Sequence, residues 1–179
     1  MAQLKKKDLS AALSRVRLLL LDVDGVLTDG RIIYNDRGEE TKVFHVRDGL
    51  GIRLLIQAGI EVGIVTGRSS RALFHRCRNL GISRVHDGVK DKVAALESIL
   101  AEAGLEQGQA AFVADDLPDL GIMGRVGLAV AVADAAAIVR ERADWVTTAP
   151  GGAGAVREVA EAILNAQGIW EQVLKRLSP

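Results

Sequence analysis

The segment "VRLLLLDVDGVLTDG", residues 16–30, contains the pattern that decides the fold. Its mainly apolar run, from Val16 to Leu21, has the length of a strand and is typical of a strand buried on both faces of a parallel sheet. Two carboxylates, Asp22 and Asp24, follow this run directly, before a glycine and a turn. Because ligands of open α/β sheets bind beyond the carboxyl ends of the strands, the segment predicts a site at these two acids.

The composition indicates one globular domain over residues 1–179, without a charge bias. A chain of 179 residues buries roughly two-thirds of the surface that it exposes when unfolded. Lysine plus arginine and aspartate plus glutamate both number 23, so no basic field is present to gather nucleic acid. With a single cysteine, Cys77, and no stretch suited to a secretion signal or a membrane span, the chain is expected in the cytoplasm, away from membranes.

Along the chain, apolar runs of strand length alternate with segments of helical period. The predicted strands cover residues 17–23, 61–66, 84–86, 110–114, 128–132 and 145–147. The predicted helices lie near residues 8–14, 48–58, 69–79, 89–103, 117–125, 135–141 and 154–166. This order predicts an α/β fold, a doubly wound parallel sheet with helices on both faces and right-handed crossovers.

Two segments depart from that alternation. The sequence "GRIIYNDRGEETKVFHV" predicts a β-hairpin at about residues 29–46, with a turn at 35–38. A lone hairpin is marginally stable and leaves open edges, so we expect it to pack on a neighbouring subunit. The C-terminal helix and tail, about residues 151–179, follow the glycines of "APGGAGAV". We interpret these glycines either as a hinge that lets the tail reach a neighbouring active site or as the cap of the last helix.

Residues suited to phosphate binding stand at two further positions. Thr66, Gly67 and Arg68 end the strand in "VGIVTGR", where a hydroxyl and backbone N–H groups can bind an anion. Lys92, in "VKDKVAAL", stands near the start of a predicted helix and can bring one positive charge to the same crevice. Each has an ordinary alternative, Thr66 as a helix cap and Lys92 as a solvated lysine.

More acids follow another strand. "AFVADDLPD" ends in Asp115 and Asp116, and Asp119 opens the next helix, where acids are also favoured for electrostatic reasons alone. Asp22 and Asp24 point the same way in an extended chain, so they repel each other unless a proton or a cation intervenes. A hard divalent ion such as Mg²⁺ meets that need through oxygen ligands.

Taken together, these strand ends favour phosphoryl transfer. A carboxylate can attack phosphorus to give an aspartyl-phosphate, which divides one difficult step into two easier ones. Threonine, backbone amides, lysine and a divalent cation would then stabilise the charge on the transferring oxygens.

The motifs "DVDGVLTDG", "VTGR", Lys92 and "DDLPD" resemble, in order, the four motifs of the haloacid dehalogenase superfamily of phosphatases. The resemblance implies Asp22 as nucleophile and Asp24 as the acid that protonates the leaving alcohol and then activates water. It implies Thr66 and Lys92 as catalytic residues that bind the phosphate. The implied ligands of Mg²⁺ are Asp22, the backbone carbonyl of Asp24 and Asp115, with Asp116 and Asp119 in support.

The spacing of the motifs leaves no room for a cap domain. Residues 24–66 hold only the hairpin and a helix, and residues 66–92 little more than a helix and a strand. A site without a cap is open to water, so a neighbouring subunit's hairpin or tail is expected to cover it.

A closer resemblance covers nearly the whole chain from about residue 10. "DGRIIYNDRGEETKVFHVRDGLGIRLL" and "GGAGAVREVAEAILNAQG" are similar to the family of 3-deoxy-D-manno-octulosonate 8-phosphate (KDO 8-phosphate) phosphatases. This implies hydrolysis of KDO 8-phosphate for lipopolysaccharide biosynthesis, by a homotetramer in which the hairpins build a shared barrel and adjacent subunits complete each site. The implied substrate contacts are Asp24, His45, Val46, Arg47, Asp48, Gly49, Arg53, Thr66, Gly67, Arg68, Arg76 and Lys92.

Two positions depart from the family pattern, and three alternatives stay open. Ala114 replaces a glycine before the acid pair, and His45 stands where related sequences often carry asparagine, which bears on the choice of sugar. The alternatives are a phosphatase for a related nonulosonate 9-phosphate, a non-catalytic phospho-receiver, and a tetramerising scaffold. In receivers the acid pair precedes the phosphorylated aspartate, whereas here the expected nucleophile comes first.

Overall fold

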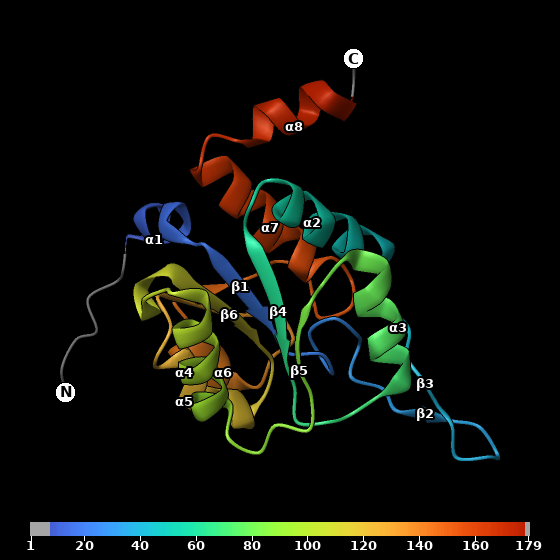
Figure 1. Ribbon diagram of the computed structural model, residues 1–179. Helices are drawn as coiled ribbons and strands as arrows, with labels where there is room; N and C mark the ends of the chain where they lie inside the picture. The colour runs from blue at the N-terminus through green and yellow to red at the C-terminus, as the bar shows by residue number, and fades with distance from the viewer. Residues whose placement is uncertain (1–7, 178–179) are drawn as a thin grey trace.

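The computed structural model describes residues 8–177, and a six-stranded parallel sheet forms the centre of the molecule (Figure 1). The strand order is β5-β4-β1-β6-β7-β8. The strands are β1 (Leu18–Leu21), β4 (Glu61–Val65), β5 (Arg84–His86), β6 (Ala110–Ala114), β7 (Leu128–Ala131) and β8 (Trp145–Val146). The predicted doubly wound α/β fold is confirmed, and each strand ends within two residues of its predicted bounds.

Helices cover both faces of the sheet (Figure 1). One layer holds α1 (Leu9–Arg15), α2 (Val46–Gln57), α3 (Arg71–Leu80) and α7 (Ala155–Ala166), with α7 packed against α1 and α2. The other layer holds α4 (Lys92–Ala103), α5 (Leu120–Met123) and α6 (Ala137–Arg142), and short 3₁₀ turns, η1 (Gln107–Gln109) and η2 (Leu117–Asp119), flank β6. Each layer takes one side of the apolar strands out of water.

Strand β1 lies between β4 and β6, and its four leucines are fully buried. Its register pairs Leu21 with Ile64 of β4 and with Val113 of β6. Burial on both faces explains why this strand is an unbroken apolar run instead of an alternating one. Because the strands are parallel, the residues that follow β1, β4 and β6 meet at one edge of the sheet.

The hairpin consists of two short antiparallel strands, β2 (Ile33–Tyr34) and β3 (Glu40–Thr41). The side-chain oxygen of Asn35 closes its turn by accepting hydrogen bonds from the N–H groups of Arg37 (3.0 Å) and Glu39 (2.9 Å). The hairpin projects from the body of the molecule beside α3 (Figure 1). Between β1 and β4 the described chain holds only this hairpin and α2, so the expected absence of a cap domain agrees with the structure.

The chain continues as a helix beyond the last helix that the sequence predicts. Gly168, with φ of 70°, turns the backbone after α7, and α8 (Trp170–Leu177) follows. An eight-residue helix is marginal in isolation and is stabilised mainly by packing. Here Val173 is buried against the body of the protein.

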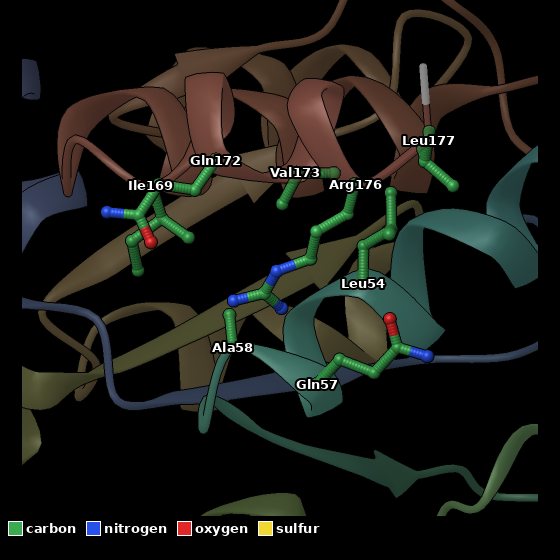
Figure 2. A pocket seen from close by; sticks show the side chains of 8 residues that line it. All are labelled: Leu54, Gln57, Ala58, Ile169, Gln172, Val173, Arg176 and Leu177. Carbon is green, nitrogen blue, oxygen red and sulfur yellow. The ribbon is translucent and has the colours of Figure 1, made fainter. Parts of the chain in front are cut away.

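Helix α8 and the C-terminal end of α2 enclose a groove of about 220 Å³ (Figure 2). Its lining residues are Leu54, Gln57, Ala58, Ile169, Gln172, Val173, Arg176 and Leu177. Arg176 reaches from α8 toward α2, and the described lining contains no carboxylate (Figure 2). The groove therefore lacks the acids that phosphoryl transfer requires. Within residues 8–177, none of the helices is both long and apolar enough to cross a membrane.

Candidate active site

The loop after β1 places Asp22 and Asp24 at the carboxyl edge of the sheet. The N–H of Asp22 donates to the carbonyl of Val113 at 3.3 Å, which continues the pairing with β6. Gly25 has φ of +89°, and a Cβ built there would lie 2.0 Å from Oδ2 of Asp115. Glycine is required at this position both for the left-handed backbone and for the close approach of the loop to Asp115.

Lys92 is the first residue of α4, and its side chain is buried among carboxylates. Asp91 caps this helix by accepting two backbone N–H hydrogen bonds of 3.0 Å. Nζ of Lys92 donates to Oδ1 of Asp119 at 2.6 Å and lies 3.1 Å from Oδ1 of Asp22. Burial alone would lower the pKa of Lys92, but Asp22 and Asp119 outweigh it and the pKa is raised.

The acids after β6 have three different environments. The N–H of Asp115 donates to Oδ2 of Asp119 at 3.3 Å, while Oδ1 of Asp119 accepts from Lys92. Asp119 is only 1% exposed, and these two contacts give each oxygen of its buried carboxylate a hydrogen-bond partner. Asp116 is exposed at the start of η2. Asp119 thus joins Lys92 to the Asp115 loop, and Asp116 stands at the rim.

Three carboxylates, from Asp22, Asp115 and Asp119, converge so that their nearest oxygens lie within 4.8 Å of one another. Burial, together with the charges of Asp22, Asp119 and Asp116, raises the pKa of Asp115 to about 7. Oδ1 of Asp115 is buried and has no hydrogen-bond partner among residues 8–177. Since an unpartnered buried carboxylate oxygen is costly, this donor set fits a hard divalent cation.

Thr66 directly follows β4 and is buried, and its hydroxyl accepts a hydrogen bond of 3.5 Å from the N–H of Arg68. The acids, Thr66 and Lys92 line a single pocket of about 270 Å³. Its lining residues are Asp22, Asp24, Thr66, Gly67, Arg68, Val89, Lys90, Lys92, Asp115, Asp116, Pro118 and Asp119. Every residue that the sequence assigns to catalysis or to the metal therefore faces the same space.

The hairpin adds charged residues that the sequence does not single out. Nζ of Lys42 donates to Oδ1 of Asp24 and lies 3.2 Å from Oε1 of Glu40. Nη2 of Arg68 donates to the same Glu40 oxygen (2.9 Å) and to the Tyr34 hydroxyl (3.2 Å). Nε of Arg68 lies 3.5 Å from Oδ2 of Asp24. Asp24, Lys42, Glu40 and Arg68 form a closed ring of alternating charge, hereafter the hairpin ring.

One local signal for the hairpin ring is present in the sequence. Glu40 and Lys42 are two residues apart at the end of an extended strand, which places both side chains on one face. Burial would raise the pKa of Glu40, but the nearby Ser70 hydroxyl and the contacts with Arg68 and Lys42 outweigh it and the pKa is lowered. The ring therefore favours the charged form of Glu40.

The sugar contacts that the resemblance implies are not all brought to this pocket within one chain. The carboxylate of Asp48 is buried and accepts hydrogen bonds from the N–H groups of Arg157 (2.8 Å) and Gly154 (3.2 Å). It thereby holds the N-terminus of α7, and burial raises its pKa despite these bonds. A substrate contact at Asp48 remains a prediction.

Other implied contacts surround the N-terminus of α2. Nη2 of Arg76 donates to the carbonyl of His45 at 3.3 Å, and a Cβ at Gly49 would lie 2.2 Å from the same nitrogen. The remaining implied contacts are exposed residues of α2, namely Val46, Arg47 and Arg53. None of the residues from this end of α2 lines the 270 Å³ pocket. They form a separate surface next to the hairpin.

The fold and the pocket define a class of protein. Residues 84–158 match the family of haloacid dehalogenase-like hydrolases, and this part of the chain carries Lys92, Asp115 and Asp119. The parallel sheet, the acids at its carboxyl edge and the buried lysine are those of a hydrolase of this class without a cap domain.

Similar proteins narrow the class to one family. The chain is 47% identical over 161 residues to 3-deoxy-D-manno-octulosonate 8-phosphate phosphatase KdsC of Escherichia coli (strain K12), covering 90% of this chain and 86% of that protein. KdsC of Salmonella typhimurium is 48% identical over 153 residues, covering 86% and 81% respectively. The chain therefore belongs to the family of 3-deoxy-D-manno-octulosonate 8-phosphate phosphatases.

Solved structures agree with this membership. The phosphatase of this name from Yersinia pestis superposes with a TM-score of 0.91 at 45% identity, covering 92% of this chain and 89% of that one. The phosphatase from Moraxella catarrhalis, solved in complex with magnesium ion, phosphate ion and KDO, superposes with a TM-score of 0.93 at 41% identity, covering 95% and 98%.

Proposed function

We propose that this chain hydrolyses KDO 8-phosphate to KDO and inorganic phosphate, with Mg²⁺ as cofactor. The observation that carries the proposal is the single pocket in which Asp22, Lys92 and Asp115 meet Thr66 at the carboxyl edge of the sheet. The names of the similar enzymes supply the substrate, and the complex from Moraxella catarrhalis supplies the metal.

The metal site that we propose is built from the oxygens that protein donors do not already occupy. The proposed ligands are Asp22, the backbone carbonyl of Asp24 and Asp115, with Asp116 and Asp119 in support. Asp119 suits the supporting role because Lys92 and the N–H of Asp115 already bind its oxygens. When bound, Mg²⁺ supplies positive charge that offsets repulsion between the carboxylates and the phosphate oxygens.

In the first step, an oxygen of Asp22 attacks phosphorus, and the bond between phosphorus and the sugar oxygen breaks. The electron pair of that bond goes to the leaving oxygen, which takes a proton from Asp24. The Thr66 hydroxyl, the N–H of Gly67 and the Lys92 ammonium stabilise the charge on the phosphoryl oxygens. The products are KDO and a phosphoryl group bound to Asp22.

The second step releases phosphate and restores the enzyme. Asp24, now a carboxylate, takes a proton from a water molecule that attacks phosphorus. The bond between phosphorus and Asp22 breaks, and its electron pair returns to the Asp22 carboxylate. Inorganic phosphate leaves, and Asp24 again carries the proton for the next turnover.

Recognition of the sugar acid is assigned to arginines. KDO 8-phosphate carries a carboxylate as well as a phosphate, and the planar guanidinium group binds such anions through paired hydrogen bonds. Arg68 lines the pocket, whereas Arg53 and Arg76 lie outside it on the same chain. We therefore assign the residues from His45 to Gly49, with Arg53 and Arg76, to sites completed between adjacent subunits.

A homotetramer is part of the proposal. The hairpin and its flanks carry large apolar side chains that solvent reaches: Ile32 (50% exposed), Ile33 (44%), Tyr34 (58%), Val43 (65%) and Val46 (77%). Apolar groups concentrated on one projection are typical of an interaction site, and hairpin pairing between subunits would bury them. We also propose that residues 1–179 form one domain that acts in the cytoplasm; residues 1–7 and 178–179 lie outside the described part.

The proposal is tested by measuring phosphate release from a panel of substrates. The panel contains KDO 8-phosphate, nonulosonate 9-phosphates and simple sugar phosphates, each with Mg²⁺ and with EDTA. We expect Mg²⁺-dependent turnover that is fastest for KDO 8-phosphate. Faster turnover of a nonulosonate 9-phosphate would move the assignment to that sugar, and His45 would be the first residue to exchange for asparagine. A protein that retains phosphate for minutes after acetyl phosphate treatment, without turnover, would indicate a receiver.

A further inference from the structure

We propose that Lys42, supplied by the hairpin of the same chain, is a positioning residue for Asp24. It holds Oδ1 of the Asp24 carboxylate, so that Oδ2 is the oxygen that exchanges a proton with the leaving alcohol. This inference rests on the proposed function and assigns a role to a residue outside the four motifs.

The side chain of Lys42 is buried, although the segment around it is largely open to solvent. Its side chain is 2% exposed, whereas its neighbours Thr41 and Val43 are both exposed. A buried ammonium group is costly unless carboxylates accept its hydrogen bonds. Asp24 and Glu40 provide them, and Glu40 is held in turn by Arg68. The position of the Lys42 ammonium is thus fixed from both sides.

The two oxygens of Asp24 have different surroundings. Oδ1 accepts the hydrogen bond from Lys42. Oδ2 is buried and has no hydrogen-bond partner among residues 8–177, although Nε of Arg68 lies 3.5 Å away. A group that transfers a proton needs one oxygen free to reach the substrate. The geometry therefore assigns anchoring to Oδ1 and proton transfer to Oδ2.

Anchoring one oxygen matters because a carboxylate turns easily about its last side-chain bond. That torsion is broad and roughly two-fold, so an unanchored Asp24 samples many orientations. Misplacement of a catalytic group by about 1 Å can lower a rate by about 100-fold. Removing Lys42 would leave Asp24 in the pocket but without a fixed direction.

A purely structural role for Lys42 makes a different prediction. If the lysine only ties the hairpin to the sheet, its loss would slow all phosphate esters equally through a weakened fold or assembly. If it positions Asp24, the loss in the first step, which releases the leaving group, depends on how much that group needs a proton. A sugar alkoxide needs protonation, whereas the nitrophenolate released from p-nitrophenyl phosphate leaves without it.

The first experiment compares Lys42→Met with wild type on KDO 8-phosphate and on p-nitrophenyl phosphate. General acid catalysis typically contributes about 10²- to 10⁴-fold, so partial misalignment should lower kcat on KDO 8-phosphate about 10- to 100-fold. On p-nitrophenyl phosphate we expect less than about a 3-fold fall in the rate of the pre-steady-state burst of nitrophenolate, because formation of the aspartyl-phosphate from this substrate needs no proton from Asp24. We expect little change in KM on either substrate. Arg37→Met removes a cation from the exposed turn of the same hairpin and should match wild type.

The second experiment is a double-mutant cycle with Asp24→Asn. Lys42→Met should cause no further loss in that background, because the group that it positions is already gone. Lys42→Arg, which keeps the donor, should restore part of the rate on KDO 8-phosphate. Should Lys42→Met not fold, Lys42→Gln keeps a polar side chain and is expected to show the same difference between substrates.

The outcomes separate this inference from the proposed function. An active wild type in which Lys42→Met slows release of the leaving group from both substrates equally, or leaves both unchanged, overturns the inference alone. The inference is also overturned if Lys42→Met lowers the rate by the same factor in the wild-type and in the Asp24→Asn background. A wild type without Mg²⁺-dependent phosphatase activity overturns the proposed function and this inference with it.

Discussion

Two charged clusters meet at the pocket, one on each side, and the first has an excess of negative charge whereas the second is balanced. On one side, the carboxylates of Asp22, Asp115 and Asp119 lie together, and within residues 8–177 the ammonium group that pairs with them is that of Lys92, which contacts Asp22 and Asp119. On the other side, the two carboxylates of the hairpin ring are matched by two cations. Burial and like charges raise the pKa of Asp115 to about 7 on the first side. On the second side, the hydrogen bonds of the ring lower the pKa of Glu40 against the effect of burial.

The difference indicates what each side is built to do. An excess of buried negative charge is stable only when a cation or a proton is added, which suits a site that recruits a metal and then a phosphate. A balanced ring needs nothing further, and its closed set of contacts keeps side chains in fixed directions. We infer that the acid side supplies charge and that the hairpin side supplies orientation.

The largest expected effect comes from the acid side. Asp22→Asn removes the nucleophile while keeping the shape of the side chain, so we expect phosphate release to fall by at least about 10⁴-fold. The fold should persist, because the substitution also removes one of three clustered negative charges. Phosphate release and circular dichroism measure the two parts of this prediction. Undiminished turnover in a folded variant would end the mechanistic assignment.

The second largest expected effect is on Mg²⁺ affinity, which should fall for a variant on the acid side but not for one in the hairpin ring. Asp115→Asn removes a proposed ligand, and we expect Mg²⁺ binding to weaken by about 100-fold or more. Lys42→Met lies in the hairpin ring and should leave the affinity within about 3-fold, because its charge acts on the orienting side. Isothermal titration calorimetry with Mg²⁺ checks both variants. Similar losses in the two would show that the sides are not separate.

Deleting the hairpin should affect assembly and turnover together. A variant that lacks Asn35 to Gly38 and the flanking strands loses both the exposed apolar side chains and Lys42. We expect smaller oligomers, and turnover slower by about 10- to 100-fold as Asp24 loses its anchor. Mg²⁺ binding should persist. Light scattering gives the mass, and an unchanged mass would contradict the role of the hairpin in assembly.

The sequence predicts the acid side well because its signals are local. The apolar run of β1 and the acids after it lie within a few residues, and the same holds for β4 with Thr66 and for β6 with Asp115. Once the strands are parallel, their carboxyl ends meet without any further information. A single chain therefore suffices to bring these residues to one pocket.

The hairpin side was missed because its contacts join distant positions. Lys42 and Asp24 are 18 positions apart, and nothing in either segment alone marks them as partners.

The glycine pair of "APGGAGAV" is a second contact that joins distant positions. A Cβ at Gly151 would lie 1.7 Å from the carbonyl oxygen of Gly25, and one at Gly152 2.4 Å from the carbonyl carbon of Thr28. These glycines pack closely on the active-site loop. The sequence suggests a hinge for the tail or a cap for the last helix, and neither interpretation includes this contact.

The smallest expected effect is on the pH dependence of folding stability, and it tests the excess of negative charge around Asp115. The pKa of Asp115 rises from 3.8 to about 7 in the folded, metal-free protein. The folded state therefore binds more protons than the unfolded state between those values, so this contribution to stability is fully present below 3.8, falls as pH rises from 3.8 to about 7, and changes little above that. The difference corresponds to about 4 kcal/mol at most, and solvent screening of a partly exposed carboxylate reduces it to about 1–2 kcal/mol.

Asp115→Asn tests this sign directly. In EDTA at pH 8, the variant lacks the repelled charge, so its Tm should exceed that of wild type by a few degrees. At pH 5 the folded Asp115 is mostly protonated and the difference in Tm should be smaller, and it should vanish only below 3.8, where the unfolded carboxyl is protonated as well. Excess Mg²⁺ should reverse the order at pH 8, because wild type alone keeps the full ligand set and gains stability from binding. A variant that is less stable at pH 8 in EDTA would show that the three carboxylates do not repel one another as the charge balance requires.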